Sequence, residues 1–278
     1  MCRGGGWAGP ANPGASVPGV LRLLAGGALY GETWGDGPPV VVVLHGWRRT
    51  HADFAASLGP SAPGGSLPTL APDLPGFGAT PAPAHAWGSV EYAAAVARLL
   101  EGEAERADGP GSGFVVVGHS LGGRIAVRLA ADRPELVGAL VLSGAPLVPR
   151  AGGPRRPARA FRLARALHRA HLVGDARMDQ ARQRHGSADY RAAQGVMRDV
   201  LVRLVNERYE DSLAALRCPV ELVWGDDDVE APVETALALA AAVPQARLTL
   251  CPGAGHLTPL TVPGELRASV ERVLAGGS

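Results

Sequence analysis

A serine flanked by glycines is the residue in this sequence best suited to chemistry. Residues 114–123 read FVVVGHSLGG, in which a valine run meets Gly118 and Ser120 follows two residues later. This order predicts a buried strand, a tight turn and the start of a helix, with Ser120 at the tip of the turn. Gly118 and Gly122 fit such a turn because side chains there would press on the neighbouring elements. Ser120 is therefore a candidate nucleophile, provided that an adjacent base activates its hydroxyl.

Short apolar runs alternate with helix-like segments along most of the chain, and they indicate how this turn is positioned. Strands are expected at 40–44, 114–117, 139–142, 220–224 and 247–251, and helices at 90–105, 122–134, 233–243 and 264–276. Valine- and leucine-rich runs of this kind are typical of strands buried on both faces. The alternation predicts an α/β fold, a mostly parallel central sheet flanked by helices, with 21–25 and 28–34 as a leading antiparallel hairpin. Ligands meet such sheets at the loops after the strands, where Ser120 lies.

One long segment departs from the alternation. Residues 147–216 contain no strand pattern, and apolar residues recur there at spacings of three and four, which predicts helices. We therefore expect a helical cap, 147–216, inserted into a core made of 20–146 and 217–278. Residues 1–19, rich in Gly, Pro and Ala, have no periodicity and are expected to form a flexible arm.

The insertion is also strongly basic. Residues 150–208 hold 14 Arg against five Asp and Glu, a balance of +9, whereas the rest of the chain amounts to −8. One interpretation is that these arginines solvate outer helix faces. The other is a positive lid that draws in acyl substrates carrying a carboxylate or phosphate.

Composition argues against several functional classes. The formal net charge of +1 over 278 residues indicates neither nucleic acid nor an anionic membrane as partner. All 27 basic residues are Arg, and the lack of lysine excludes a lysine-containing phosphate loop and Schiff-base chemistry. The three cysteines, Cys2, Cys218 and Cys251, are too widely spaced to indicate a set of disulfides or a zinc site. The sequence offers no third ligand near His168 and His171, so we expect neither a metal nor a cofactor. The sequence shows no signal-peptide core or membrane span, which favours the cytoplasm.

Five short motifs occur in an order that is known from one family. They are LHGW (44–47), DLPGFG (73–78), GHSLGG (118–123), WGDDDVEAP (224–232) and GAGH (253–256). From about residue 21 to 275 the chain resembles the α/β-hydrolase fold superfamily, and within it serine hydrolases with a Ser-Asp-His triad and a helical cap. The resemblance implies a fold and a class of mechanism, whereas substrates vary widely within the superfamily.

The resemblance implies a role for each part of the expected site. Ser120 matches the nucleophile and His256 its base, and the order of serine, acid and histidine is the one that the family uses. The G-x-x-D-x-x-x-P spacing of the acid loop favours Asp228, with Asp226 and Asp227 as rivals. A carboxylate is needed there because it sets the tautomer of the histidine and stabilises the imidazolium.

The same resemblance implies an oxyanion hole made of main-chain donors. Leu121, directly after the nucleophile, and Trp47, directly after His45 and Gly46, would supply the two backbone N–H groups. The Trp47 ring is alternatively a wall of the acyl pocket.

These residues imply hydrolysis of a small-molecule acyl substrate without a cofactor. A serine nucleophile with an oxyanion hole attacks a carbonyl carbon and forms an acyl-enzyme, which water then releases. Carboxylic esters, thioesters and lactones are the expected substrates. The alternatives are a carbon–carbon bond hydrolase of diketones, a cofactor-free perhydrolase and a ligand-binding sensor with vestigial hydrolysis. Family members that open epoxides or displace halide use an aspartate nucleophile, which Ser120 argues against.

Overall fold

The structure is a computed structural model that describes residues 21–24, 29–107, 111, 113–149, 167–168, 174, 177 and 188–276. The expected arm 1–19, His171 and most of the arginine-rich part of the insertion lie outside these residues. The division into arm, core and cap therefore stays a prediction where it depends on them.

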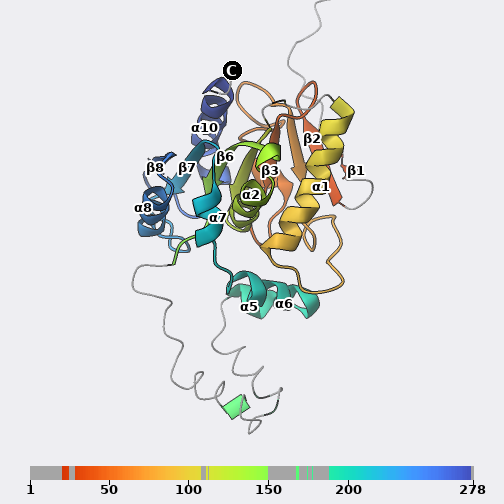
Figure 1. Ribbon diagram of the computed structural model, residues 1–278, viewed down its shortest axis with the longest axis vertical. Coiled ribbons are helices and arrows are strands. Elements are labelled where there is room, and N and C mark those ends of the chain that lie inside the picture. Colours follow the sequence, from red (N-terminus) through yellow and green to blue (C-terminus); the bar gives the residue numbers. More distant parts are fainter. Residues whose placement is uncertain are drawn as a thin grey trace, which may run out of the picture.

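An eight-stranded sheet forms the centre of the structure, in the order β1-β2-β4-β3-β5-β6-β7-β8 (Figure 1). Its strands are β1 (Arg22–Leu24), β2 (Leu29–Trp34), β3 (Val41–Leu44), β4 (Thr69–Pro72), β5 (Phe114–His119), β6 (Val137–Ser143), β7 (Val220–Gly225) and β8 (Ala246–Cys251). β1 and β2 form an antiparallel hairpin, β2 is also antiparallel to β4, and the other neighbours are parallel. The expected mostly parallel sheet with a leading hairpin is thus confirmed.

β4 is the strand that the sequence pattern missed. Its residues TLAP lack the valine-rich character of the inner strands, and Pro72 is more typical of a turn or a strand end. In the structure β4 lies between β2 and β3, with Thr69 paired to Trp34 on one side and to Val41 on the other, and all four residues are buried. Its place inside the sheet outweighs its weak propensity.

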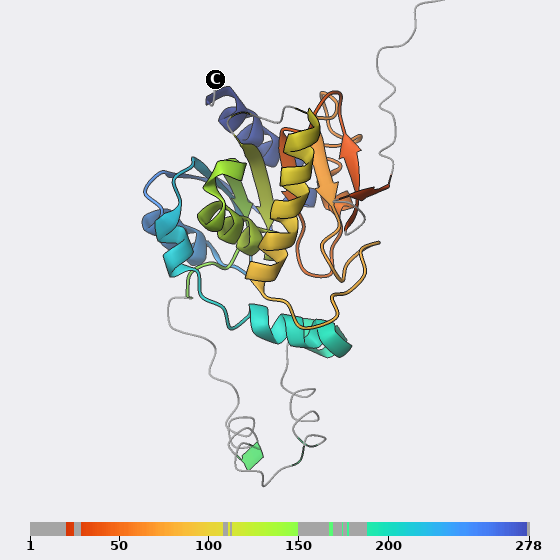
Figure 2. The ribbon, with the colours of Figure 1, turned by 45° about the vertical axis from the view of Figure 1, so that its right-hand side comes forward.

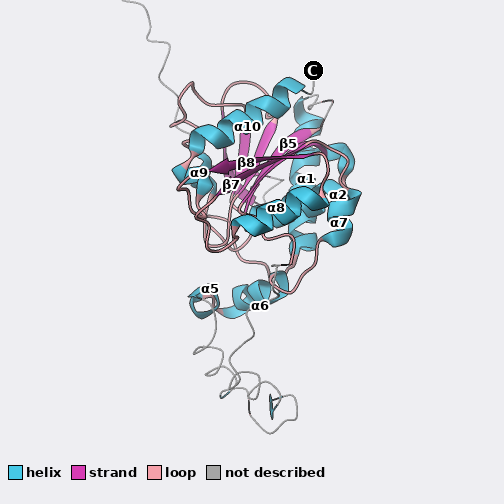
Figure 3. Cartoon of the chain, turned by 90° about the vertical axis from the view of Figure 1, so that its left-hand side faces the viewer, coloured by secondary structure: helices cyan, strands magenta, loops and turns pink. Residues whose placement is uncertain are grey.

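Helices cover both faces of the sheet (Figures 1 and 3). On one face α1 (Ser89–Ala107), α2 (Leu121–Asp132) and α8 (Val233–Ala242) bury side chains that include Tyr92, Ile125 and Leu239. On the other face α10 (Pro263–Gly276) buries Leu266 and Val270, beside the short helices η2 (His51–Phe54) and α9 (Thr258–Thr261). The long helices begin and end within two residues of the expected ranges. None of the described helices is long and apolar enough to cross a membrane.

The insertion leaves the sheet after β6 and returns at β7. Its described helices are α5 (Ala188–Ala192), α6 (Gly195–Leu204) and α7 (Glu210–Ala215), and Figure 2 shows α5 and α6 across one end of the body. Arg203 Nη2 donates to Glu91 Oε1 at 2.6 Å, which ties the end of α6 to α1. Arg128 Nη1 donates to Ser212 Oγ at 2.7 Å and ties α7 to α2. The insertion is therefore anchored to α1 and to α2, the helix that begins directly after Ser120.

Candidate active site

Ser120 lies on the turn between β5 and α2. Its backbone has a φ of 51° and a ψ of −108°, a conformation that costs a residue other than glycine on the order of 1–3 kcal/mol. A Cβ on Gly118 would stand 2.7 Å from the backbone of Gly122 and of Gly123, and a Cβ on Gly122 would collide with the carbonyl of Leu44. The glycines therefore permit the close approach of β3, β5 and α2 that forces Ser120 outward.

His256 and Asp228 lie on the loops after β8 and β7, beside this turn. His256 Nδ1 is 2.8 Å from Asp228 Oδ2. Asp228 is only 3% exposed, and its Oδ1 accepts hydrogen bonds from the amides of Glu230 and Ala231, each at 2.8 Å. A carboxylate held by three donors is fixed in position.

The two rival aspartates lie elsewhere. Asp226 and Asp227 are exposed. Asp226 Oδ1 accepts from the Gly253 amide at 2.7 Å, and the Asp227 amide donates to Ala254 O at 3.0 Å. These bonds join the acid loop to the histidine loop. Asp226 and Asp227 thus contact the backbone of the histidine loop and not the ring of His256.

The carboxylates around His256 stabilise its charged form. Burial alone would lower the pKa of His256, but the hydrogen bond to Asp228 and the charges of Asp228, Glu230 and Asp189 raise the pKa above its ordinary value of 6.5. Glu230 Oε2 is 3.5 Å from the other ring nitrogen, Nε2. The ring is thus set up to accept a proton.

Two other histidines support the site and stay neutral. Burial lowers the pKa of His119 to about 3 and the pKa of His45 to about 4. His119 Nδ1 is 3.2 Å from Ser143 O, and the centre of its ring is 4.9 Å from that of His256. His45 Nδ1 donates to Gly46 O at 2.8 Å, and its Nε2 accepts from the Leu74 amide at 2.9 Å. His45 therefore joins the LHGW loop to the DLPGFG turn, while His119 adds no charge beside His256.

The amides of Trp47 and Leu121 are available to a ligand. Neither donates to a backbone carbonyl within the part of the chain that the structure describes. Leu121 opens α2, where the first amides of a helix have no partner in the helix and the helix dipole favours negative charge. The Trp47 ring packs edge-on against Phe77, with the ring centres 5.0 Å apart. Trp47 lines the cavity, and its role as an oxyanion donor or as a wall of the acyl pocket stays a prediction.

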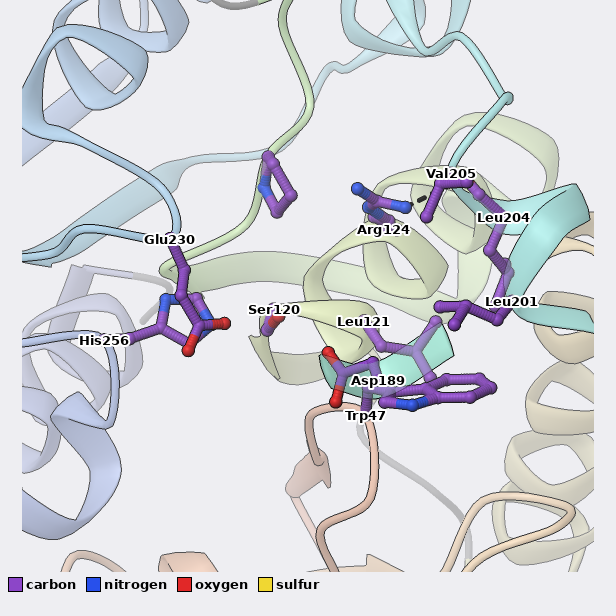
Figure 4. Close-up of a pocket in the computed structure, with 11 residues that line it drawn as sticks. Trp47, Ser120, Leu121, Arg124, Asp189, Leu201, Leu204, Val205, Glu230 and His256 are labelled. Atoms are coloured by element: carbon purple, nitrogen blue, oxygen red, sulfur yellow. Dashed lines mark hydrogen bonds and ion pairs between the residues drawn. The ribbon is translucent and has the colours of Figure 1, made fainter. Parts of the chain in front are cut away.

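Ser120 and His256 line a cavity with two lobes. The first, here called the Arg124 lobe, has a volume of about 150 Å³ and is bounded on one side by Leu121, Arg124, Pro146, Leu201, Leu204 and Val205 (Figure 4). The second, the Arg48 lobe, has a volume of about 350 Å³ and is bounded by Gly46, Arg48, Arg49, His119 and Leu257. Both lobes are lined by Trp47, Ser120, Asp189, Glu230 and His256. Leu201 and Leu204 belong to α6, so the insertion forms part of the wall.

The described residues contain no group of three or more His, Cys, Asp and Glu side chains arranged to hold a metal ion. Residues 41–269 match the model of the alpha/beta hydrolase family. The chain belongs to this family. Like other such hydrolases, it combines an eight-stranded, mostly parallel sheet with helices on both faces.

Several known proteins are similar to this hydrolase. Lipase LipV of Mycobacterium tuberculosis is 35% identical over 221 residues, which cover 77% of this chain and 78% of the lipase. The pimeloyl-[acyl-carrier protein] methyl ester esterase of Aromatoleum aromaticum is 30% identical over 267 residues, or 86% of this chain and 99% of that enzyme. The structure of a thermophilic esterase from Thermogutta terrifontis superimposes with a TM-score of 0.64 at 20% identity, covering 94% and 99% of the two chains. The hydrolase thus has esterase and lipase relatives.

Three charged residues at the site of this hydrolase were not singled out by the sequence. Arg124 follows Ser120 by four residues, about one helical turn, so helix periodicity was a usable signal for it. Glu230 follows Asp228 by two residues in the same loop. Asp189 lies in α5, and only the tertiary structure brings it to the cavity.

Proposed function

We propose that this hydrolase cleaves carboxylic esters, with thioesters and lactones as related substrates, through an acyl-enzyme on Ser120. The observation that carries the proposal is the 2.8 Å contact between His256 Nδ1 and Asp228 Oδ2, beside a cavity that His256 shares with Ser120. A proton on Nδ1, held by the carboxylate, leaves Nε2 as the basic nitrogen of the ring. His256 then activates the serine hydroxyl.

The first half of the reaction forms the acyl-enzyme. Ser120 Oγ attacks the ester carbonyl carbon while His256 Nε2 takes its proton. The N–H groups of Leu121 and Trp47 stabilise the charge that develops on the carbonyl oxygen, and loss of one such donor typically costs about 2.7–4 kcal/mol. The C–O bond of the ester then breaks, and His256 gives its proton to the leaving alcohol.

The second half returns the enzyme to its starting state. Water attacks the acyl carbon while His256 Nε2 takes a proton from it, and the same two amides stabilise the oxyanion. The bond to Ser120 Oγ breaks, the carboxylic acid leaves, and His256 returns the proton to the serine. Every step uses groups of this chain and water alone.

The relatives favour an ester bond as the target. One is named a lipase, another a methyl ester esterase, and the superimposed structure is that of an esterase. A diketone hydrolase, a perhydrolase and a sensor with vestigial hydrolysis are the competing functions, because they place the same residues in the same fold.

Replacement of the serine tests this proposal directly. Ser120→Ala should remain folded but lose covalent labelling by a fluorophosphonate, and its kcat on p-nitrophenyl esters should fall by on the order of 10⁶, as expected when a serine nucleophile is removed. Ser61→Ala, at an exposed serine, is the matched control and should behave as the wild type. Labelling that persists in Ser120→Ala would overturn the assignment.

A substrate panel separates the competing functions. Wild-type turnover of esters, thioesters and lactones should exceed turnover of diketones, and peracid formation from acid and hydrogen peroxide should be slow by comparison. Faster cleavage of diketones would favour the carbon–carbon hydrolase, and labelling without turnover of any substrate would favour the sensor.

A further inference from the structure

Arg124 occupies an unusual position in the active-site cavity. It lies on α2 one turn beyond Ser120 and lines the Arg124 lobe among mostly apolar neighbours from α2, α6 and the loop after β6. Its Nη1 donates to Leu204 O, the last residue of α6, at 2.8 Å. A guanidinium has five N–H donors and stays protonated in proteins, so this bond and a hydrogen bond to Tyr209 leave part of its hydrogen-bonding capacity for a ligand.

Among the residues that the structure describes, Arg124 forms no ion pair with a carboxylate, whereas Arg49 and Arg203 do. Arg49 donates twice to Asp53, at 2.6 Å each, and Arg203 is 2.6 Å from Glu91. No such ion pair is formed by Arg124 within the described part of the chain.

The surroundings of Arg124 explain why an added anion would be favourable there. Burial lowers the pKa of Arg124, and the charge of Glu207 and the hydrogen bond to Tyr209 offset that effect only in part. Glu207 is itself engaged, because its carboxylate accepts hydrogen bonds from the Ser89 amide and the Tyr209 hydroxyl. A cation that is partly desolvated and unpaired gains more from an incoming carboxylate than a solvated one does.

The acidic residues of the cavity lie at its rim. Asp189 has 45% of its side chain exposed and faces Arg48 at 3.8 Å. Glu230 has 65% of its side chain exposed and faces His256 at 3.5 Å. Solvent screens both charges, so they oppose an anion deeper in the Arg124 lobe only weakly.

The chemistry of the site decides which arm of the substrate reaches Arg124. His256 gives its proton to the leaving alcohol, so the alcohol must lie on the His256 side of Ser120. In Figure 4, Ser120 lies between His256 on one side and Leu121, Trp47 and Arg124 on the other. The acyl arm therefore points into the Arg124 lobe.

We propose that Arg124 determines specificity by binding a carboxylate at the far end of the acyl arm, so that the preferred substrates are monoesters of short dicarboxylic acids. This inference rests on the proposed esterase function. The lobe volume of about 150 Å³ equals that of a cavity that holds one benzene molecule. A lobe of this size suits a short acyl arm, for example three methylenes and a carboxylate.

The test compares two esters of equal shape and different charge. Monomethyl glutarate carries the carboxylate, and methyl 5-oxohexanoate replaces it with a methyl ketone; hydrolysis of both is followed by acid release at constant pH. The wild type should show a higher kcat/KM for the glutarate ester. Arg124→Met should lower the anionic-to-neutral ratio of kcat/KM by about tenfold to a hundredfold, mainly through KM, because a hydrogen-bonded charge pair is lost. Arg124→Lys should retain part of the preference.

Arg128 provides the matched control. It lies one turn further along α2, donates to Ser212 Oγ at 2.7 Å and to Arg208 O at 3.0 Å, and does not line the Arg124 lobe. Arg128→Met removes comparable hydrogen bonds between α2 and the insertion. It should leave the anionic-to-neutral ratio of kcat/KM unchanged. A merely structural role of Arg124 would lower turnover of both esters equally, and that result would overturn the inference.

The remaining outcomes separate this inference from the proposed function. Ester turnover without any preference for the glutarate ester in the wild type would overturn the role of Arg124 alone. Failure of the wild type to hydrolyse either ester, or p-nitrophenyl acetate, would overturn the esterase function and this inference with it.

Discussion

At the scale of single residues, three consecutive aspartates show how one carboxylate is selected among chemically equal neighbours. Asp228 is buried and contacts His256, whereas Asp226 and Asp227 are exposed and connect their loop to the histidine loop through Gly253 and Ala254. The difference arises because the turn after β7 directs only one of the three side chains inward.

Substitution of each aspartate by asparagine tests this selection. Asp228→Asn should lower kcat by about 10⁴, because an amide in this position favours the wrong tautomer of His256. Asp226→Asn keeps an oxygen that accepts the hydrogen bond from the Gly253 amide, and Asp227→Asn changes only an exposed side chain. The kcat of both variants should therefore stay close to that of the wild type. Steady-state kinetics on one p-nitrophenyl ester measure all three variants. A larger loss at Asp226 or Asp227 would transfer the role to that residue.

Glu230 affects His256, the proposed base, through its charge. Its carboxylate lies 3.5 Å from His256 Nε2 and contributes to the raised pKa of that histidine. His256 acts as a base only when neutral, so Glu230→Gln should move the acidic limb of the kcat/KM profile to lower pH. High salt should reduce the difference from the wild type, because Glu230 is exposed. Glu234→Gln, at an exposed glutamate on α8, should leave the profile in place. If the acidic limb of the kcat/KM profile stays at the same pH in Glu230→Gln, Glu230 does not influence His256 in this way.

At the scale of elements, the residues of the site are held in place by different kinds of structure. Ser120 is held by β5, which is buried along its whole length, and by α2, which begins at the next residue. Asp228 and His256 lie on loops, which are held against each other by backbone and side-chain bonds between 226–228 and 253–254. The wall of the Arg124 lobe depends on α6, whose end is tied to α1 by Arg203 and to α2 by Arg124. Changes in α6 should therefore affect substrate selection before they affect the base.

At the scale of the whole molecule, a half-buried histidine couples stability to pH. His51 Nδ1 is 2.7 Å from Asp73 Oδ1, and its Nε2 is 3.5 Å from Glu32 Oε1, so His51 joins η2, β2 and the turn after β4. Burial alone would lower the pKa of His51, but the bond to Asp73 and the charges of Asp73 and Glu32 raise it above 6.5. The stability that a raised pKa supplies is fully present below about pH 6.5 and is lost as the pH rises through the folded-state pKa.

His51→Asn should therefore destabilise the protein more in acid than in base. We expect a loss of about 1.5–3 kcal/mol in the free energy of unfolding near pH 5.5, as for a hydrogen bond to a charged group, and a smaller loss near pH 8.5. Urea denaturation of the wild type and the variant at both pH values measures this loss in the free energy of unfolding. His85→Asn, at an exposed histidine, is the control and should cost little at either pH. An equal loss at both pH values in His51→Asn would refute the coupling.

The sequence by itself was sufficient for the features that depend on neighbouring residues. Valine runs ending in glycine placed the β5–α2 turn and Ser120, and apolar periodicity placed α1, α2, α8 and α10 within two residues, because strand burial and helix periodicity are local properties. Motif order identified the α/β-hydrolase fold, which the family match confirms.

The tertiary structure decided what depends on the adjacency of distant segments. It placed β4 inside the sheet despite its weak pattern, and it brought Asp228 to a histidine 28 residues away because β7 and β8 are neighbours. It also brought Asp189 and α6 to the cavity and left Arg124 without a carboxylate partner in the described residues. A contact between segments far apart in the chain is set by how the sheet is ordered and the insertion folds back, and no local pattern carries that information.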